Sequence, residues 1–357
     1  IGVELMSVAA RDLLRGRGAL VDEASGVVKL DRVIVEWALS QAPSTFTLTS
    51  RNPAKQLVIG GRNVAFGLVA GPPFVHDFER GRRAGNYADY CDFIRLAHYF
   101  NAIHLIGNQV CAPVELPANS RHLDAYRANL VYSDLAYHCT AIGAGRARDG
   151  IEMMAIARGI TAEQMAESPG VLTIISVNSP RRFDEAMADG LMTMARYGQP
   201  VVVTPFTLMG AMAPVSLAGA LAQQNAEVLF GLVLAQAVRP GTPVMYGAFT
   251  SNVDMKSGAP AFGTPEYMKA TIVGGQLDRR YKVPFRTSNT CAANTVDAQA
   301  AYESANTLQT AALAGVNRSA LLAAAVKDWL QAQMGAVVVD AKKKVSATAR
   351  RKKRDLA

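Results

Sequence analysis

The sequence predicts an α/β protein, a TIM-type (β/α)8 barrel with an N-terminal α/β cap. From residue 88 onward, short apolar segments with strand character alternate with long helical segments. Polar side chains gather where these predicted strands end, as at the mouth of a barrel enzyme. The doubly wound alternative needs a glycine-rich GxGxxG turn after an early strand, and the chain has none. Its 357 residues exceed the roughly 250 that one such barrel needs.

Residues 1–87 have a less regular organisation and are predicted to form the cap. Helical spacing of apolar residues predicts helices over 8–18 and 31–41. Short strand candidates lie at 26–30, 45–49, 57–59 and 64–69. Because this mixture precedes the regular alternation, we expect it to cover one end of the barrel.

Residues 88–317 are predicted to form the barrel itself. Strands are expected at 103–111, 137–143, 171–177, 201–206, 244–249 and 283–290. Helices are expected between and beside them at 89–100, 122–133, 147–158, 182–197, 216–237 and 265–281. Strands separated by long helices imply parallel pairing through right-handed crossovers.

Composition argues against nucleic-acid and membrane partners. Eight of the 37 Lys and Arg residues lie in the tail 341–357, so most of the net charge of +8 belongs to this tail. No apolar run reaches the ~18 residues of a membrane helix. The four cysteines have no metal-ligand or disulfide-framework spacing, which suits free thiols in a reducing compartment. We therefore expect a cytoplasmic protein.

The predicted strand ends are rich in neutral amides and thioethers and poor in the His, Asp and Cys clusters that hold metals. No metal site is expected. His104 and His138 fall inside strand patterns and are interpreted as core histidines. GxSxG, HExxH and phosphate-loop motifs are absent, which excludes the commoner hydrolases and nucleotide-binding enzymes.

Three long segments resemble the trimethylamine methyltransferase family. They are GPPFVHDFERGRRAGNYADYCDFIRLA (71–97), LPANSRHLDAYRANLVYSD (116–134) and the stretch 242–304, which contains FTSNVDMKSGAPAFGTPEYMK and FRTSNTCAANTVD. The resemblance extends from residue 1 to about 317. It implies a TIM-type barrel that moves a methyl group from a quaternary or tertiary methylamine to the cobalt of a separate corrinoid protein.

The resemblance also implies what the chain does not carry. The corrinoid belongs to the partner protein, so no cofactor is expected to be tightly bound here. Family members that act on trimethylamine carry pyrrolysine, which this sequence lacks. The chain therefore resembles the non-pyrrolysine branch, which includes glycine betaine methyltransferases. Glycine betaine, proline betaine, carnitine and choline all stay open as substrates.

Aromatic residues near the strand ends are candidates for binding a quaternary ammonium group. Such a group has no N–H donor and is held by aromatic faces, worth roughly 0.5–2 kcal/mol per good contact. The candidates are Phe74, Tyr246, Phe249, Phe262 and Tyr267. Each is also an ordinary packing residue in an alternative interpretation.

Polar residues near the same strand ends complete the predicted site. Asp254 and Glu266 are the catalytic candidates, able to balance the ammonium charge or to protonate a leaving amine. Glu266 also follows Pro265 at a helix start, where a carboxylate complements the helix dipole. Arg286 is the candidate for binding a substrate carboxylate, or else an ion-pair partner. Asn252 and Asn289 are further substrate-binding candidates.

The carboxyl end departs from the family pattern near residue 318. Residues 318–340 are expected to add one helix and one strand that partly close the barrel, with a second copy of the chain as a candidate to complete it. Residues 341–357 are expected to be a disordered basic tail. If the barrel cannot close, a non-catalytic barrel that binds a betaine-like ligand is the alternative function. A lyase with Lys256 as a Schiff-base lysine is a third.

Overall fold

The structure is a computed structural model, and it describes residues 2–69, 71–77 and 79–315. The predicted terminal segments 318–340 and 341–357 lie outside the described residues. Within the described range, every strand and helix predicted for 88–317 is present, with shorter strands than predicted.

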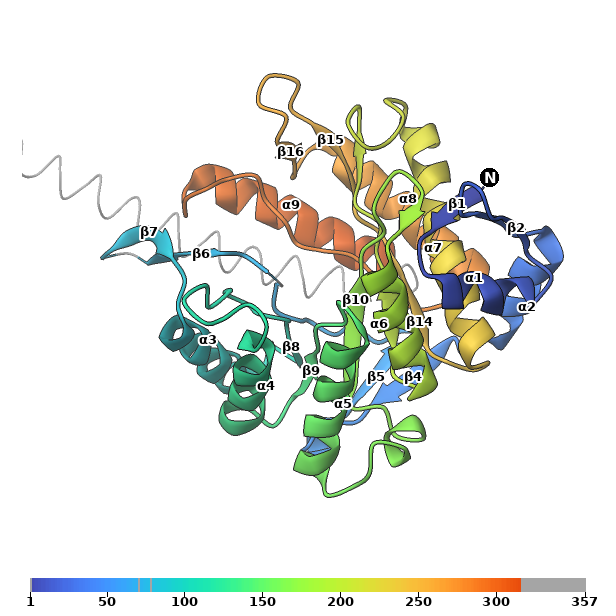
Figure 1. Cartoon of the computed structure of the whole chain (residues 1–357). Helices are drawn as coiled ribbons and strands as arrows, with labels where there is room; N and C mark the ends of the chain where they lie inside the picture. Colours follow the sequence, from blue (N-terminus) through green and yellow to red (C-terminus); the bar gives the residue numbers. More distant parts are fainter. Residues whose placement is uncertain (1, 70, 78, 316–357) are drawn as a thin grey trace, which may run out of the picture.

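A curled parallel sheet forms the centre of the molecule (Figure 1). Its six strands pair in the order in which they occur in the sequence, and every pairing is parallel. They are β8 (Leu105–Ile106), β9 (Ala136–His138), β10 (Val171–Ile175), β12 (Val201–Val203), β14 (Val244–Gly247) and β17 (Phe285–Arg286). Sequential parallel order with one helix per crossover makes this a singly wound half-barrel.

A further short segment extends the sheet beyond β8. Gly67 forms a parallel bridge with Leu105, and the Leu68 amide donates to the Leu105 carbonyl at 3.2 Å. The segment falls within the predicted cap, but its pairing makes it the first member of the curled sheet. A cavity of 310 Å³ lies between this edge and β17 at the opposite edge, and both edges line it.

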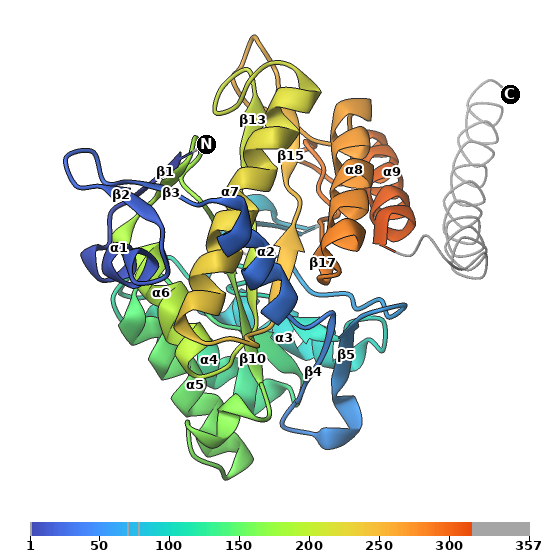
Figure 2. The ribbon, with the colours of Figure 1, turned by 90° about the vertical axis from the view of Figure 1, so that its right-hand side faces the viewer.

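Seven helices alternate with these segments and cover the outer face of the sheet. Each contacts the next in sequence, as Figures 1 and 2 show for α4 to α9. They are α3 (Tyr87–Tyr99), α4 (Arg121–Tyr132), α5 (Ala144–Arg158), α6 (Glu185–Arg196), α7 (Leu217–Val238), α8 (Pro265–Tyr281) and α9 (Ala298–Gly315).

Local sequence signals fix where several of these helices begin. The side chains of Asp184, Ser216 and Thr264 accept hydrogen bonds from backbone N–H groups in the first turns of α6, α7 and α8. Pro265 follows Thr264 as the first residue of α8, where its missing N–H costs nothing. These caps place the helix starts, and therefore the preceding loops, at one end of the sheet.

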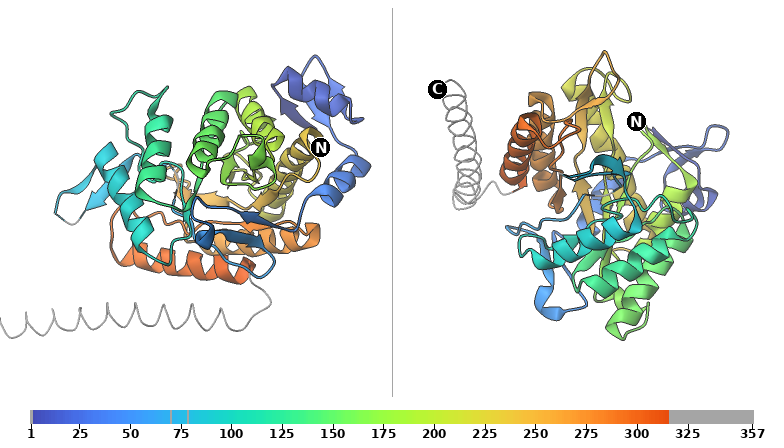
Figure 3. Two further views of the ribbon diagram at one scale, coloured as in Figure 1. Left: turned by 90° about the horizontal axis from the view of Figure 1, so that it is seen from below. Right: turned by 90° about the vertical axis from the view of Figure 1, so that its left-hand side faces the viewer.

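A hairpin of β4 (Thr45–Leu48) and β5 (Leu57–Gly60) covers the opposite end, where the strands begin (Figure 3, left). The hairpin loop contains the 3-10 turn η1 (Pro53–Lys55). Leu48 and Ile59 pack against inward-facing strand residues to form a compact apolar cluster, completed by Ala136, Leu172, Val202 and Met245. This part of the predicted cap therefore closes the floor of the half-barrel.

Residues 2–41 lie elsewhere, on the outside of the helical layer. Strand β1 (Gly2–Leu5) pairs with β11 (Arg182–Phe183), and β3 (Val27–Lys29) and β2 (Leu20–Asp22) follow beside it. Helices α1 (Val8–Arg15) and α2 (Arg32–Gln41) contact α7, and Figure 2 shows α2 next to it. Their apolar stripes pack sideways onto this helix rather than over an end of the barrel.

A three-stranded sheet extends above the ends of β12 and β14. It consists of β13 (Thr207–Met209), β15 (Thr250–Val253) and β16 (Pro260–Ala261). Thr207 pairs with Thr250 in register, and their hydroxyl groups are hydrogen-bonded. The loops at this end therefore rise above the sheet as an ordered wall.

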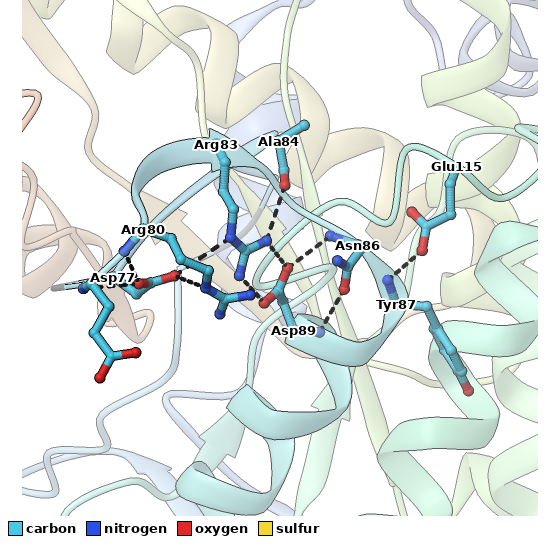
Figure 4. Close-up of polar contacts among 9 residues, drawn as sticks. Asp77, Arg80, Arg83, Ala84, Asn86, Tyr87, Asp89 and Glu115 are labelled. Carbon is cyan, nitrogen blue, oxygen red and sulfur yellow. Dashed lines mark hydrogen bonds and ion pairs between the residues drawn. The ribbon is translucent and has the colours of Figure 1, made fainter.

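A second hairpin, β6 (Phe74–Asp77) and β7 (Gly81–Ala84), projects from the molecule next to α3 (Figure 1). Figure 4 shows how charged groups anchor it. Arg83 donates from both terminal nitrogens to Asp89 at 2.5 Å, and Asp89 also caps the amino end of α3. Asp77 accepts from Arg80 at 2.8 Å. The hairpin is thus held to α3 and not to the concave face of the sheet.

Helix α7 corrects one expectation from the sequence. Among the described residues it is the helix that is long and apolar enough to cross a membrane by length and composition. In the structure, 61% of its most apolar window is buried, and it contacts α1, α2, α6 and β12. The apolar residues of α7 therefore pack against neighbouring elements on several sides of the helix.

Candidate functional site

The concave face of the sheet changes from apolar to polar along the strands. Alternate strand residues point to opposite faces, so Tyr137 packs outward with its hydroxyl on the Gly150 carbonyl, and His138 points inward. In the same way, Phe285 approaches α8 at Gly274, and Arg286 points inward. Both His138 and Arg286 line the 310 Å³ cavity above the apolar floor.

Arg286 is a cation without a carboxylate partner among the described residues. Its side chain takes part in no hydrogen bond or ion pair within the described part of the chain, and desolvation on burial lowers its pKa from the ordinary value. A guanidinium group in such a position is well suited to bind an anionic ligand.

Four aromatic rings form a cluster where β12 and β14 end. Phe249 stacks on Phe206 and on Phe262, with ring centroids 4.9 and 5.3 Å apart. Tyr267 meets Phe262 edge-on at 5.9 Å. The three phenylalanines are half-buried, so part of their faces stays accessible. Such a set of faces can hold a quaternary ammonium group.

The aromatic cluster lies beside the cation, although its four rings are not among the described residues that line the 310 Å³ cavity. The Arg286 guanidinium carbon lies 5.9 Å from the centroid of the Phe249 ring. The pairing of Gly247 with Arg286 causes this proximity, because Phe249 follows Gly247 by two residues and therefore continues on the same side.

Three of the five predicted aromatic residues are brought together: Phe249, Phe262 and Tyr267. Tyr267 is fully buried and donates its hydroxyl to the Ser288 carbonyl at 2.7 Å, so its contribution is an edge of the cluster. The structure places the other two elsewhere. Tyr246 points away from the concave face: its hydroxyl meets Gln224 and Asn225 of α7, and its ring stacks on Tyr281.

Phe74 is the second aromatic residue outside the cluster. It lies on the β6–β7 hairpin, is 46% exposed, and has the Arg82 guanidinium 3.8 Å from its ring centroid. The charged network of Figure 4 fixes this hairpin on α3. The sequence signal that suggested Phe74 was its position beside a predicted strand end, which says nothing about the direction of the hairpin.

The predicted acids occupy the rim of the site. Asp254 is exposed in the β15–β16 turn, where the Ser257 hydroxyl and the Lys256 amide donate to it and lower its pKa. Lys256, the predicted Schiff-base candidate, is exposed in the same turn. Glu266 is half-buried in the first turn of α8, next to Tyr267 of the aromatic cluster.

The predicted asparagines both hold loops. Asn252 accepts a hydrogen bond from the Thr264 hydroxyl at 2.8 Å, which ties β15 to the start of α8. Asn289 lines the cavity and accepts from Ser304 and Thr307 of α9 at 3.0 and 2.8 Å. Their oxygens are therefore already used within the protein.

Two residues of this site were not among the candidates predicted from the sequence. Phe206 ends the predicted strand 201–206 as Phe249 ends 244–249, and the two positions correspond because Val203 pairs with Tyr246 and Thr207 with Thr250. That correspondence is the signal that could have found it. His138 was interpreted as a core histidine; it is buried, at 5% exposure, but it lines the cavity.

Comparison with known proteins identifies the family. The model of the trimethylamine methyltransferase (MTTB) family matches residues 1–348. The chain belongs to this family. A glycine betaine methyltransferase of Desulfitobacterium hafniense is 39% identical to it over 318 residues, which cover 89% of this chain and 66% of that protein.

Other relatives in the family are more distant. The trimethylamine methyltransferase MttB of Desulfitobacterium hafniense is 28% identical over 88% of this chain and 64% of its own length. A proline betaine:corrinoid methyltransferase of Eubacterium limosum is 26% identical over 80% and 60%, respectively. The chain thus spans slightly less than two thirds of these relatives. A crystal structure of the hydroxylamine MtmB complex has a TM-score of 0.46 and 10% identity, covering 86% of this chain and 74% of that one.

Proposed function

We propose that this chain takes part in the transfer of a methyl group from a carboxylate-bearing quaternary amine, such as glycine betaine, to the cobalt of a corrinoid protein. The observation that carries the proposal is the 5.9 Å approach of Arg286 to Phe249. It sets a cation for a carboxylate next to aromatic faces for an ammonium group. In glycine betaine one methylene separates the two charges, so a single molecule can contact both.

The reaction asks for positioning more than for a protein nucleophile. Cobalt(I) of the corrinoid supplies the electron pair for the new carbon–cobalt bond, while the electron pair of the broken carbon–nitrogen bond leaves with the amine. The product amine departs neutral, so no proton donor is required for its departure. What the chain must supply is orientation of one methyl group toward the open mouth and exclusion of water.

Glu266 is the acid that fits a supporting role in this proposal. It lies beside Tyr267 at the start of α8, close to the aromatic cluster. A carboxylate there would add negative potential around the ammonium group. Asp254 is exposed and accepts hydrogen bonds from residues of its own turn, which favours a role in holding this turn over a catalytic role.

The rim of the site offers a surface for the corrinoid protein. Val215 and Met255 are 81% and 83% exposed, and both approach Gly210 above the ends of the strands. Exposed apolar groups around a concave site are typical of a docking surface. We expect the partner to cover this rim during transfer.

The fold that the proposal requires is a (β/α)8 barrel. Six sequential parallel strands, the paired segment at Gly67 and seven outer helices supply the order of such a barrel, with its binding end where the strands finish. A cytoplasmic location is also part of the proposal. The four free thiols, three of them buried, support it because they suit a reducing compartment.

Methyl transfer is tested by mixing the full chain with cobalt(I) cobalamin and glycine betaine under anaerobic conditions. The expected products are methylcobalamin, followed by its visible spectrum, and dimethylglycine in equal amounts. Choline, which has the ammonium group but no carboxylate, is the matched substrate control and is expected to react much more slowly. A ligand-binding protein without activity, the alternative from the sequence, would bind glycine betaine and form neither product.

A further inference from the structure

His138 has one ring nitrogen whose role the fold explains and one whose role it leaves open. The imidazole is 5% exposed and lies on the concave face of β9. Its Nε2 atom accepts a hydrogen bond from the Ile174 amide of the neighbouring strand at 2.9 Å. A ring nitrogen that accepts carries no proton, so in the neutral imidazole the proton is on Nδ1.

The protein keeps this histidine neutral. Burial lowers the pKa of His138 to about 3 together with the nearby positive charge of Arg286, which acts in the same direction. At physiological pH the ring is therefore a neutral N–H donor in a fixed tautomer. A neutral donor next to a guanidinium group avoids the repulsion that a second cation would cause.

The Nδ1–H group has no acceptor among the described residues. The ring lines the 310 Å³ cavity that Arg286 also lines. A donor at the edge of a cavity is satisfied when a ligand or water in the cavity accepts its hydrogen bond. Two hydrogen-bond donors of the described chain therefore line the same cavity: the neutral imidazole of His138 on β9 and the charged guanidinium group of Arg286 on β17.

We propose that His138 and Arg286 together bind the substrate carboxylate, with Arg286 supplying the charge and His138 donating from Nδ1 to one carboxylate oxygen. This inference rests on the proposed function and adds to it a specificity-determining residue. Its consequence is selection: a small zwitterion with a carboxylate close to its ammonium group is bound in preference to a simple quaternary cation. The aromatic cluster then binds the ammonium end of the substrate, and the His138–Arg286 pair binds the carboxylate end.

A purely structural role for His138 makes a different prediction. In that case the Ile174 hydrogen bond is all that matters, and any replacement acts on folding alone, with equal effect on every ligand. Asparagine is the informative substitution because its amide can accept from Ile174 and still donate into the cavity. Leucine fills similar space but can do neither.

The test measures binding by calorimetry with two probes, glycine betaine and tetramethylammonium, on the full chain. We compare the parent protein with His138→Leu, His138→Asn and the control His76→Asn, which changes an exposed histidine on β6. His138→Leu is expected to weaken glycine betaine binding by at least about tenfold, or ~1.4 kcal/mol, and tetramethylammonium binding by less than about twofold. His138→Asn is expected to retain most of the affinity for glycine betaine.

Melting curves of all variants show which proteins are folded, and the Asn variant keeps the test decisive if the Leu variant is not. An equal loss for both probes in a folded variant, or unchanged binding of glycine betaine to His138→Leu, overturns the inference. So does a parent protein that binds neither probe. If the parent transfers methyl groups from glycine betaine while His138→Leu binds it normally, the inference alone fails and the proposed function stands.

Discussion

The Arg286 guanidinium carbon lies 5.9 Å from the centroid of the Phe249 ring, across two neighbouring strands that the chain reaches some 40 residues apart. The relationship joins a group suited to binding an anion to a ring suited to binding a cation. Because both are half-buried on one side of the sheet, a ligand that satisfies both must itself carry both charges.

The aromatic cluster should bind the ammonium end of the substrate. Phe249→Ala removes the ring that contacts both Phe206 and Phe262, and it should weaken binding of tetramethylammonium by about 0.5–2 kcal/mol. Phe93→Ala is the control, because Phe93 is 38% exposed on α3, outside the cluster. Calorimetry that shows equal affinities for the two variants would remove Phe249 from the site.

Arg286 should act on the carboxylate end. Arg286→Leu should lower the affinity for glycine betaine by at least about tenfold, since a charge-assisted hydrogen bond contributes roughly 1.5–3 kcal/mol. Arg286→Lys should restore part of it, because the charge remains and the planar fork is lost. Arg280→Leu, at an exposed position of α8, controls for the loss of one positive charge. A similar loss in the Arg280 variant would contradict a local role for Arg286.

Tyr246 should affect stability through the helices. Its hydroxyl accepts from Gln224 and donates to Asn225, both at 3.3 Å on α7. Tyr246→Phe should therefore lower the free energy of unfolding by about 0.5–1.5 kcal/mol, measured by urea denaturation. An unchanged unfolding midpoint would mean that these two hydrogen bonds contribute nothing net.

Asp278 should make stability depend on pH. It is 7% exposed, its Oδ1 has no partner among the described residues, and burial raises its pKa from 3.8 to about 7. Between these two values the folded state holds a proton that the unfolded state has released. Stability from this group therefore falls as pH rises from about 4 to about 7, and it is constant above that range.

The measurement is the difference in melting temperature between the parent protein and Asp278→Asn at pH 5 and at pH 8. The melting temperature of Asp278→Asn, relative to that of the parent protein, should be higher at pH 8 than at pH 5, because an amide cannot ionise. Other carboxylates affect both proteins equally and cancel in this comparison. Identical pH profiles for the two proteins would show that Asp278 titrates normally.

The exposed rim should serve the partner protein. Met255→Glu places a charge on an 83% exposed apolar side chain and should slow transfer to a corrinoid protein by at least about tenfold, or ~1.4 kcal/mol. Transfer to free cobalamin does not need a protein interface and should change little. A variant that loses both activities to the same extent would place Met255 in the chemistry or in folding, and not in docking.

Periodicity was sufficient for the helices and main strands predicted over 88–317, because each encodes its own pattern, but the shorter strands β6, β7, β13, β15 and β16 were not predicted. Helix α8 begins and ends where its Pro265 start and apolar spacing predict. Tertiary facts were harder to predict. The pairing of Gly67 with Leu105 depends on a partner 38 residues away, and the hairpin that carries Phe74 is directed by Arg83 and Asp89.

For the site, too, the sequence pattern predicted which segments take part but not how they pair. Strand ends could be found, so Phe249, Phe262 and Arg286 were predicted, but the face of each residue follows from strand register. Tyr246 and Met245 are neighbours in the sequence, and register alone puts Met245 in the cavity and Tyr246 against α7. His138 was seen as buried, which is correct, and its free N–H could only be recognised once Ile174 was known to occupy the other nitrogen.

The central claim is that one site holds a carboxylate-bearing quaternary amine and gives one of its methyl groups to cobalt. The most direct measurement is the anaerobic reaction of the full chain with cobalt(I) cobalamin and glycine betaine, with methylcobalamin and dimethylglycine measured together. The account predicts equal amounts of both products from the parent protein and at least about tenfold slower formation with Arg286→Leu, equivalent to ~1.4 kcal/mol. Neither product from a folded parent protein that binds glycine betaine would contradict it.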